Sequence, residues 1–419
     1  MSKLKVTVIG LGYIGLPTAA IISKRKIMTY GFDINKSIVN TINKGNIHIT
    51  EPKLDKIVSK SVSSGYLKAS TKIKKSNIFI ITVPTPLKEE NLPDISYIMN
   101  AASSIASHLH KGNLIILEST SPIGTTRLLS EKLKALRPDL IFPHEDSDVQ
   151  DINICYCPER VIPGNTINEL ISNDRVIGGI TKECSDKAAD FYKKFVKGDC
   201  YETSAETAEL SKLAENSFRD LNIAFANEIS MICSEKNINV WELIAIANKH
   251  PRVNILQPGP GVGGHCIAVD PWFIVSSSKN AKLIKKAREI NIQKTRFIFN
   301  EIKSSVTEIK KELSIKTANI NIALFGLAFK ADIDDLRESP AIDIVNQVIK
   351  KLDSNILIVE PNITKLPNFL KDSAKLCSVK YAAKNCHLAV CLVDHKEFKS
   401  LRKNDFKNKM IIDSKGIWK

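Results

Sequence analysis

A glycine-rich turn near the start of the chain constrains its fold most strongly. The run Gly10-Leu-Gly12-Tyr-Ile-Gly15 follows the apolar segment 4–10 and precedes a stretch of small residues from about Pro17. An apolar run before such a turn predicts a buried strand, and the small residues predict a helix that packs on it. The sequence therefore predicts the strand–turn–helix unit that opens a parallel α/β sheet.

The same turn has the spacing of a dinucleotide-binding site. Gly10 permits the tight turn, Gly12 lets the backbone approach a pyrophosphate, and Gly15 lets the helix pack on the strand. The helix N-terminus offers N–H donors and a positive dipole to phosphates. Asp33 ends a second strand 18 residues after Gly15, where a carboxylate accepts from a ribose 2′-hydroxyl and repels a 2′-phosphate. The pattern predicts NAD as the cofactor, in preference to NADP.

Further strands alternate with helical stretches through the first part of the chain. One strand closes on Pro84-Thr85-Pro86, and another closes on Ser119-Thr120-Ser121-Pro122. This alternation predicts a doubly wound parallel sheet, whose ligands bind where the strands end. We therefore expect a Rossmann-type NAD-binding domain over residues 1–202.

The pattern changes to long helices after that domain. Residues 203–236 contain no glycine or proline and have apolar residues at helical spacing. The stretch 271–312 has a similar helical pattern. Strand-like segments then return, at 320–326, 355–361, 388–393 and 410–413. The sequence predicts a central helical domain over 203–312 and a smaller Rossmann-like α/β domain over 313–419. Two sheets joined by helices suggest two ligands that meet across a cleft.

The composition excludes several classes of protein. The formal charge is +15 over 419 residues, but the lysines are scattered among acids, without the basic stripe that binds nucleic acid. No apolar run approaches the ~20 residues of a membrane span, and the first residues read as a strand, not a signal peptide. Nine irregularly spaced cysteines indicate reduced thiols, and Cys155 and Cys157 lack a second pair for zinc. We expect a cytoplasmic protein without a metal.

One cysteine stands on a turn that is suited to chemistry. Residues 258–273 read Pro-Gly-Pro-Gly-Val-Gly-Gly-His-Cys-Ile-Ala-Val-Asp-Pro-Trp-Phe, with Asp270 four residues after Cys266. Glycines let a substrate approach the backbone, and free N–H groups meet developing negative charge. A thiolate there could attack a carbonyl carbon. The alternative is a turn-rich loop around a buried cysteine.

A dinucleotide site and a reactive cysteine together narrow the chemistry. A cysteine can trap an aldehyde as a thiohemiacetal, whose hydride loss to NAD gives a thioester that water releases as an acid. Lys212, Asn216 and Arg219 are spaced i, i+4 and i+7, so they share one face of a helix. An amide between two cations is typical of a concave site that binds an anion. The alternative is a solvated helix surface.

The chain resembles a known family over essentially its whole length. Six ordered motifs carry the resemblance: Gly-Leu-Gly-Tyr-Ile-Gly, Val-Pro-Thr-Pro, Glu-Ser-Thr-Ser-Pro-Ile-Gly-Thr-Thr, Tyr-Cys-Pro-Glu-Arg, Lys-Leu-Ala-Glu-Asn and Gly-Gly-His-Cys. They are similar to those of the nucleotide-sugar 6-dehydrogenases, the UDP-glucose/GDP-mannose dehydrogenase family. The run 250–273 looks most like members that act on UDP-N-acetyl-D-mannosamine. The resemblance implies oxidation of the sugar C6 alcohol to a carboxylate, with two NAD per product, for surface polysaccharide such as a capsule or enterobacterial common antigen.

The resemblance also implies roles for individual residues. Cys266 would be the nucleophile, and Lys212 would be a proton donor or acceptor and oxyanion stabiliser. Asn216 and Asp270 would help to hold the sugar or water, and Thr120 and Glu159 would lie near the nicotinamide and the reacting carbon. The expected NAD contacts beyond the glycines are Tyr13, Ile14, Asp33, Thr85, Thr126 and Arg337. The UDP-sugar would be held by Arg160, Val161, Lys212, Asn216, Arg219, His250, Arg252, Gly263 and Lys330. In the expected homodimer, Arg252 and His250 would reach the partner's site. The alternative is that His250 and Arg252 cap a helix.

Two positions depart from the wider family. UDP-glucose dehydrogenases typically carry an acid where this chain has Pro163 and a lysine where it has Val269. Both changes argue against glucose and leave the residue that activates the hydrolytic water open. The rival functions are a sister enzyme for UDP-N-acetylglucosamine or UDP-glucose, an NAD-binding sensor without activity, and a basic nucleic-acid-binding module. The sensor should have lost Cys266 or Lys212, and both are present.

Overall fold

The computed structural model describes residues 4–145, 147, 149–162 and 164–418, so Pro163 lies outside the described residues. The chain divides into two compact units. The first comprises residues 1–215 and 272–278, and the second comprises residues 216–271 and 279–419.

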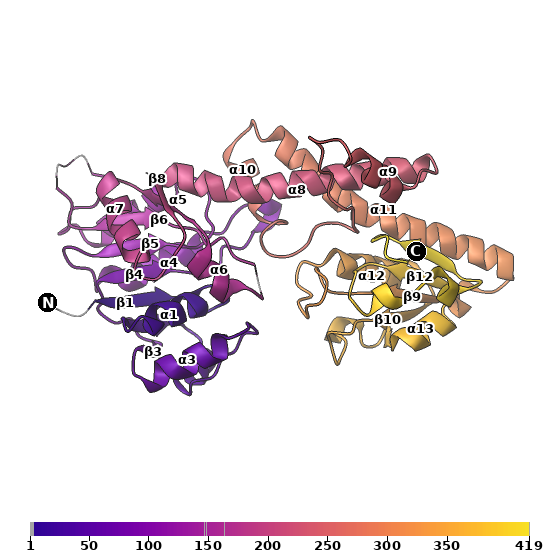
Figure 1. Cartoon of the computed structure of the whole chain (residues 1–419), viewed down its shortest axis with the longest axis horizontal. Coiled ribbons are helices and arrows are strands. Elements are labelled where there is room, and N and C mark those ends of the chain that lie inside the picture. Colours follow the sequence, from indigo (N-terminus) through magenta and orange to yellow (C-terminus); the bar gives the residue numbers. More distant parts are fainter. Residues whose placement is uncertain (1–3, 146, 148, 163, 419) are drawn as a thin grey trace. The chain divides into compact units, whose positions relative to one another are not determined.

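An eight-stranded sheet forms the centre of the first unit (Figure 1). Its strands are β1 (Lys5–Ile9), β2 (Met28–Phe32), β3 (Leu67–Ser70), β4 (Ile78–Ile81), β5 (Leu114–Leu117), β6 (Asn153–Tyr156), β7 (Arg175–Gly179) and β8 (Cys200–Ser204), in the order β3-β2-β1-β4-β5-β6-β7-β8. All neighbours are parallel except β6 and β7, which pair antiparallel. The chain reverses its winding direction between β1 and β4, which confirms the predicted doubly wound sheet.

Helices cover both faces of this sheet. They are α1 (Gly15–Lys24), α2 (Lys36–Asn43), α3 (Leu54–Ser63), α4 (Ser96–Ala106), α5 (Thr125–Leu136), α6 (Thr166–Ser172) and α7 (Lys182–Tyr192). Strand β4 is buried along its length: Ile78 and Ile80 belong to one apolar core, and Phe79 and Ile81 belong to the core of the opposite face. A continuous apolar run is therefore what this central strand requires.

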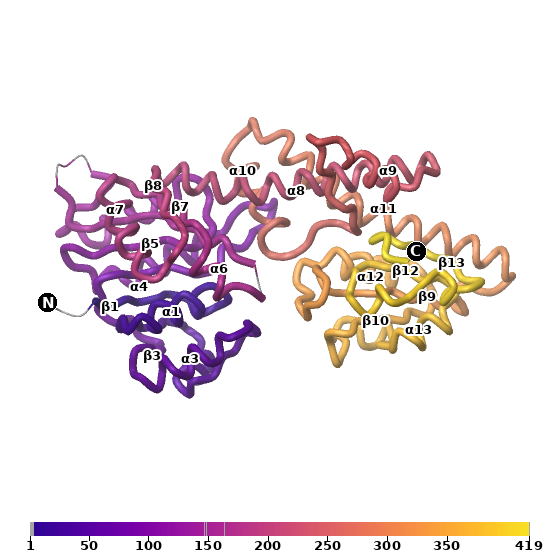
Figure 2. Tube along the Cα trace, in the orientation of Figure 1, coloured from indigo at the N-terminus to yellow at the C-terminus, as the bar shows by residue number. Residues whose placement is uncertain are grey.

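Four helices follow the sheet. They are α8 (Ala205–Glu235), α9 (Val240–Ala247), α10 (Asp270–Ser277) and α11 (Lys282–Leu313). The trace in Figure 2 follows α8 as one uninterrupted helix. The helical stretch expected over 271–312 is interrupted, because α10 ends before α11 begins. The hydroxyls of Ser276 and Ser277 donate to the carbonyls of Phe273 and Ile274, and such local bonds favour helix ends over helix interiors.

A second, five-stranded parallel sheet lies in the second unit. Its strands are β9 (Asn321–Phe325), β10 (Asn355–Val359), β11 (Lys375–Leu376), β12 (Leu388–Cys391) and β13 (Met410–Asp413), in the order β11-β10-β9-β12-β13. Helices α12 (Pro340–Lys351) and α13 (Val379–Asn385) accompany it. This order repeats that of the first five strands of the larger sheet, so the predicted Rossmann-like C-terminal domain is confirmed.

The fold class is thus the predicted one, with an α/β domain at each end and helices between them. The boundaries after residues 202 and 312 stay a proposal. Among the residues that the structure describes, no helix combines the length and the apolarity that a membrane span requires.

Candidate functional site

The glycine turn after β1 leaves an open space at one position. Gly10 has φ +90°, and a Cβ on it would lie 2.7 Å from the Thr82 carbonyl oxygen. A Cβ on Gly15 would lie 1.8 Å from the Gly10 carbonyl oxygen. Packing therefore requires these two glycines. A Cβ on Gly12 would meet no atom within 4 Å, so this glycine borders room for a ligand.

Asp33 holds this turn from the end of β2. Its Oδ2 accepts from the Leu11 N–H at 3.0 Å, and its Oδ1 accepts from the Asn35 N–H at 2.8 Å. The residue is half-buried, so the carboxylate keeps lone pairs for a ligand hydroxyl. Exposed Tyr13 and half-buried Ile14 complete the turn before α1.

Two of the predicted threonines differ in their surroundings. The Thr85 hydroxyl oxygen is buried and has no hydrogen-bond partner among the described residues. A buried polar atom of this kind fits a ligand that supplies the missing bond. Thr126 is fully buried at the start of α5, and its N–H and Oγ1 lie 2.7 and 2.6 Å from Glu209 Oε1. Glu209, which sequence reasoning missed as a partner, therefore anchors the N-terminus of α5. Thr120, the third threonine, lies half-buried after β5.

Lys212 and Glu159 form a buried ion pair. Lys212 Nζ lies 3.1 Å from Glu159 Oε1 and 2.8 Å from the Glu159 carbonyl oxygen. Lys212 is 6% exposed, and Glu159 is 8% exposed. Burial strengthens the attraction between the two charges and removes them from water. Next to them, the Arg160 guanidinium lies 2.7 Å from Glu215, and the Val161 N–H donates to Glu159.

Two further carboxylates, neither of them marked by a sequence motif, bind the main chain after Glu159. Glu51, which is 6% exposed, accepts from the Gly164 N–H at 2.9 Å and from the Thr166 N–H at 2.8 Å. Glu169 accepts from the Ile162 N–H at 2.7 Å. The main-chain N–H groups of Ile162, Gly164 and Thr166 are thereby bound by two carboxylates.

In the second unit, Cys266 lies on the turn that leads into α10. The cysteine is exposed, and its carbonyl oxygen accepts from the N–H of Val269 at 3.0 Å and of Asp270 at 2.8 Å. Asp270 is 2% exposed, and its Oδ2 accepts from Asn216 Nδ2 at 2.5 Å. The structure thus brings together Asn216 and Asp270, which are 54 residues apart. Lys212 and Asn216 are one turn apart on α8.

The remaining candidates are mostly exposed cations. Arg219, His250, Arg252 and Lys330 are all exposed. His250 lies just beyond the end of α9, and its Nδ1 accepts from the Arg252 N–H at 3.3 Å. This bond joins two residues beyond α9 and is not a bond to the last carbonyls of the helix, so both the substrate-binding role and the capping role stay predictions.

Gly263 and Arg337 lie in different surroundings. A Cβ on Gly263 would lie 2.3 Å from the Glu338 carbonyl oxygen, so only glycine fits there. The Arg337 guanidinium forms two bonds to Asp335, of 2.8 and 2.7 Å.

Comparison with family models covers most of the chain. Three parts of one family match: the NAD binding domain of the UDP-glucose/GDP-mannose dehydrogenase family over residues 4–196, its central domain over 206–293 and its UDP binding domain over 323–419. The match confirms the resemblance predicted from the six motifs.

Relatives match from end to end. A UDP-N-acetyl-D-mannosamine dehydrogenase of Yersinia pestis is 52% identical over 420 residues, covering 100% of both chains. An NDP-N-acetyl-D-galactosaminuronic acid dehydrogenase of Ralstonia nicotianae is 50% identical, covering 99% of this chain and 96% of its own. Among solved structures, a UDP-N-acetyl-mannosamine dehydrogenase from Staphylococcus aureus is 41% identical with a TM-score of 0.85, covering 99% of this chain and 96% of its own. The chain belongs to the UDP-glucose/GDP-mannose dehydrogenase family and is an NAD-dependent oxidoreductase.

Proposed function

We propose that this enzyme oxidises the C6 alcohol of UDP-N-acetyl-D-mannosamine to the carboxylate of UDP-N-acetyl-D-mannosaminuronate. The observation that carries the proposal is the full-length match to the Yersinia pestis dehydrogenase, 52% identical over 420 residues. The presence of Cys266, Lys212, Asn216 and Asp270 supports the same chemistry. The product would supply an acidic sugar for surface polysaccharide.

The proposed reaction removes four electrons in two steps. Bound NAD would accept a hydride from C6 in each oxidation. In the first, the C6 hydroxyl loses its proton and becomes an aldehyde. The Cys266 thiolate then adds to the aldehyde carbon, and the resulting thiohemiacetal loses its second hydrogen as hydride to become a thioester. Water breaks the carbon–sulfur bond, so the acid leaves and the thiol returns.

Lys212 is the proposed partner of the charge that develops on the C6 oxygen. Its buried ammonium is already oriented by Glu159, so little reorganisation is needed as an oxyanion forms. Asn216 and Asp270 would orient the sugar or the hydrolytic water, because their mutual hydrogen bond fixes both side chains. Glu159 and Thr120 would lie near the reacting carbon.

The proposed NAD-binding residues, apart from Arg337, belong to the unit that contains the first sheet. Gly12 and the start of α1 would face the pyrophosphate, and Asp33 would accept from the adenosine ribose. The buried Thr85 hydroxyl would gain a partner. The other proposed contacts are Gly10, Tyr13, Ile14, Gly15, Thr126 and Arg337.

The UDP-sugar would be held mainly by cations, since a pyrophosphate favours clustered guanidinium and ammonium groups. The proposed residues are Arg160, Val161, Lys212, Asn216, Arg219, His250, Arg252, Gly263 and Lys330. The proposed use of NAD and a UDP-sugar supports the further proposal that the enzyme is cytoplasmic.

A homodimer is proposed from an apolar stripe on α8. Phe218, Phe225 and Ile232 recur every seven residues and are 72%, 49% and 46% exposed. Large apolar side chains in a row favour burial against a partner. A second copy would cover this stripe, and His250 and Arg252 would reach the partner's site.

NADH formation on a set of nucleotide sugars tests the substrate. The purified enzyme should reduce NAD with UDP-N-acetyl-D-mannosamine and release two NADH per sugar. UDP-N-acetylglucosamine, UDP-glucose and UDP-N-acetylgalactosamine are the comparison substrates, the last because of the name of the Ralstonia relative. Activity on UDP-glucose alone would refute the substrate, and NAD binding without turnover on any sugar would favour a sensor.

A further inference from the structure

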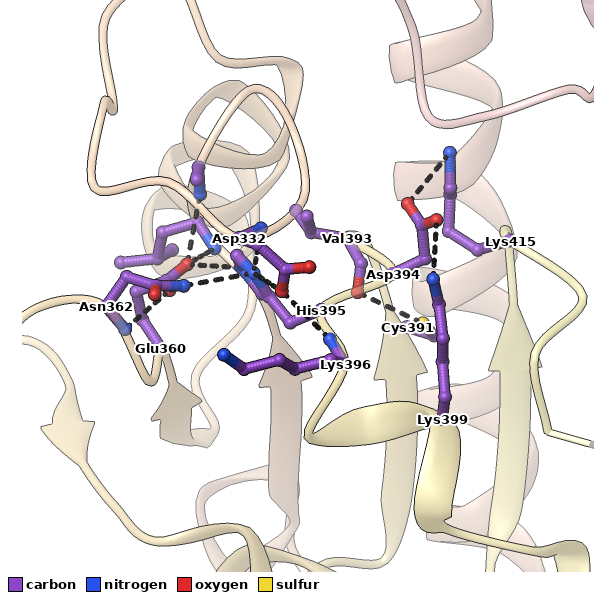
Figure 3. A network of polar contacts seen from close by, with 12 residues as sticks. Asp332, Glu360, Asn362, Cys391, Val393, Asp394, His395, Lys396, Lys399 and Lys415 are labelled. Carbon is purple, nitrogen blue, oxygen red and sulfur yellow. Dashed lines mark hydrogen bonds and ion pairs between the residues drawn. The ribbon is translucent and has the colours of Figure 1, made fainter. Parts of the chain in front are cut away.

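A buried acid and a buried imidazole meet at the carboxyl end of the smaller sheet (Figure 3). Glu360 directly follows β10 and is 3% exposed, and His395 lies beyond β12 and is fully buried. Glu360 Oε2 lies 3.0 Å from His395 Nε2. The same oxygen accepts from the main-chain N–H of Leu327 at 2.7 Å and of Ala328 at 3.1 Å. Glu360 therefore holds the start of the loop after β9.

His395 holds the other end of that loop. The Asp332 main-chain N–H lies 2.9 Å from His395 Nδ1, and an N–H can only donate. Nδ1 must therefore be the unprotonated nitrogen, and Nε2 carries the hydrogen that is donated to Glu360. Burial favours the neutral acid, but the hydrogen bonds from His395 and Leu327 outweigh it and lower the pKa of Glu360. Glu360 and His395 thus hold loop 327–332 at both ends.

The equivalent acid of the larger sheet is used differently. Asp33 directly follows β2, which pairs with β1, and Glu360 directly follows β10, which pairs with β9. The glycines that follow β1 and β9, Gly10 and Gly326, both have positive φ, +90° and +98°. Asp33 is half-buried and accepts from two main-chain N–H groups. Glu360 is buried, and its second oxygen also accepts from the Asn362 N–H at 3.1 Å. Glu360 is therefore committed to the protein, and a ribose cannot reach it.

Loop 327–332 also contacts the Cys266 turn. A Cβ on Gly264 would lie 2.8 Å from the Phe329 ring, so this ring packs directly on the glycine two residues before Cys266. The Gly264 N–H also donates to the Glu338 carbonyl oxygen at 3.3 Å. Lys330, the next residue of the loop, is exposed. The path of loop 327–332 therefore sets the places of both Lys330 and the Cys266 turn.

We propose that Glu360 and His395 are positioning residues of the reaction, because they fix the conformation of loop 327–332. In that conformation Lys330 binds the UDP-sugar, and Phe329 packs against the Cys266 turn and holds it in place. This inference rests on the proposed function. The side chains of Glu360 and His395 are buried and bind main-chain N–H groups of the loop, so they would act through the loop.

His387 offers a matched control. Its Nδ1 also accepts a main-chain N–H, that of Asn321, at 2.9 Å, and it precedes β12 whereas His395 follows it. His387 therefore holds the amino end of β9, away from loop 327–332. Replacing either histidine removes an equivalent bond, but only one change releases the loop.

The experiment compares His395→Ala with His387→Ala in the full-length enzyme. UDP alone is titrated calorimetrically, and KM is measured for NAD and for the UDP-sugar. We expect His395→Ala to raise the Kd for UDP and the KM for the UDP-sugar at least tenfold, about 1.4 kcal/mol. The KM for NAD should stay within about twofold, and His387→Ala should leave the Kd for UDP unchanged even where it lowers Tm.

Two partial replacements keep the test decisive if His395→Ala does not fold. His395→Asn retains an acceptor for the Asp332 N–H, and His395→Gln retains a donor for Glu360. Each variant should bind UDP more weakly than the wild type does. The KM for NAD should stay at the wild-type value in both. Unchanged UDP binding in the His395 variants, or an equal loss in His387→Ala, would overturn the positioning role alone. A wild type that does not bind UDP would overturn the proposed function itself.

Discussion

Lys212 Nζ lies 3.1 Å from Glu159 Oε1 in a buried ion pair, and the same nitrogen lies 2.8 Å from the Glu159 carbonyl oxygen. The lysine on α8 is thereby fixed to the turn that follows β6. A buried ammonium held in this way is preorganised to stabilise a developing oxyanion.

Lys212→Ala should lower kcat about 10²–10³-fold, the usual cost of losing one oxyanion-stabilising group. It should also destabilise the fold by about 3–5 kcal/mol, since Glu159 is left as a buried unpaired charge. Steady-state NADH production and urea unfolding measure the two effects. Lys187→Ala is the control, because Lys187 forms an exposed pair with Glu183 and should change neither quantity. A wild-type kcat in Lys212→Ala would remove Lys212 from the mechanism.

The two glycines of the first turn should separate folding from cofactor binding. Gly12→Ala should keep the wild-type Tm, because its Cβ meets no protein atom within 4 Å, yet raise the KM for NAD at least about tenfold by occupying pyrophosphate space. Gly15→Ala should lower Tm, because its Cβ would lie 1.8 Å from the Gly10 carbonyl oxygen. Thermal unfolding and NAD titration give both values. Unchanged NAD affinity in Gly12→Ala would place the pyrophosphate elsewhere.

Phe225→Lys should convert the proposed homodimer into a monomer, because a charge in the centre of the α8 stripe would be buried without a partner. Light scattering after gel filtration measures the mass. Phe369→Lys is the control, since Phe369 is 60% exposed and far from α8 in sequence. A wild type that is monomeric at micromolar concentration would refute the dimer.

Lys294→Met should raise the free energy of unfolding at pH 7 by about 1–3 kcal/mol. Lys294, on α11, is a buried residue, and this burial lowers the pKa of its ammonium group from 10.5 to about 8. Between these values the unfolded chain binds more protons than the folded one, so wild-type stability rises with pH there. The advantage of the methionine variant should therefore be complete below pH 8 and shrink toward pH 10.5. Urea unfolding at pH 7 and 10 measures it, and an equal advantage at both would contradict the assigned pKa.

The sequence predicts those features that depend on contacts between residues close together in the chain. Gly10, Gly15 and Asp33 act within one strand–turn–helix unit, so their spacing alone indicates the dinucleotide turn. Helix α8 could be predicted because a long run without glycine or proline contains no residue that ends a helix. The break in the helical stretch after Pro271 also has a local basis, since the Ser276 and Ser277 hydroxyls bind main-chain carbonyls three residues earlier.

Pairings between distant residues were not predictable from one sequence. One example is Thr126, whose N–H and hydroxyl bind Glu209, 83 residues away. Likewise Glu360 and His395 lie 35 residues apart and carry no motif. Their roles depend on how parallel strands bring their carboxyl ends to one edge of a sheet, which only the folded chain shows.

The most direct test of the central claim is the overall turnover of Cys266→Ser with UDP-N-acetyl-D-mannosamine and NAD. Removing the nucleophile should lower acid formation at least about 10³-fold. Cys377→Ser, at another cysteine that is not fully buried, should keep wild-type turnover. Acid formation is followed by mass spectrometry together with NADH absorbance. A loss of at least 10³-fold restricted to Cys266→Ser would support the thioester route, whereas wild-type acid production by Cys266→Ser would contradict it.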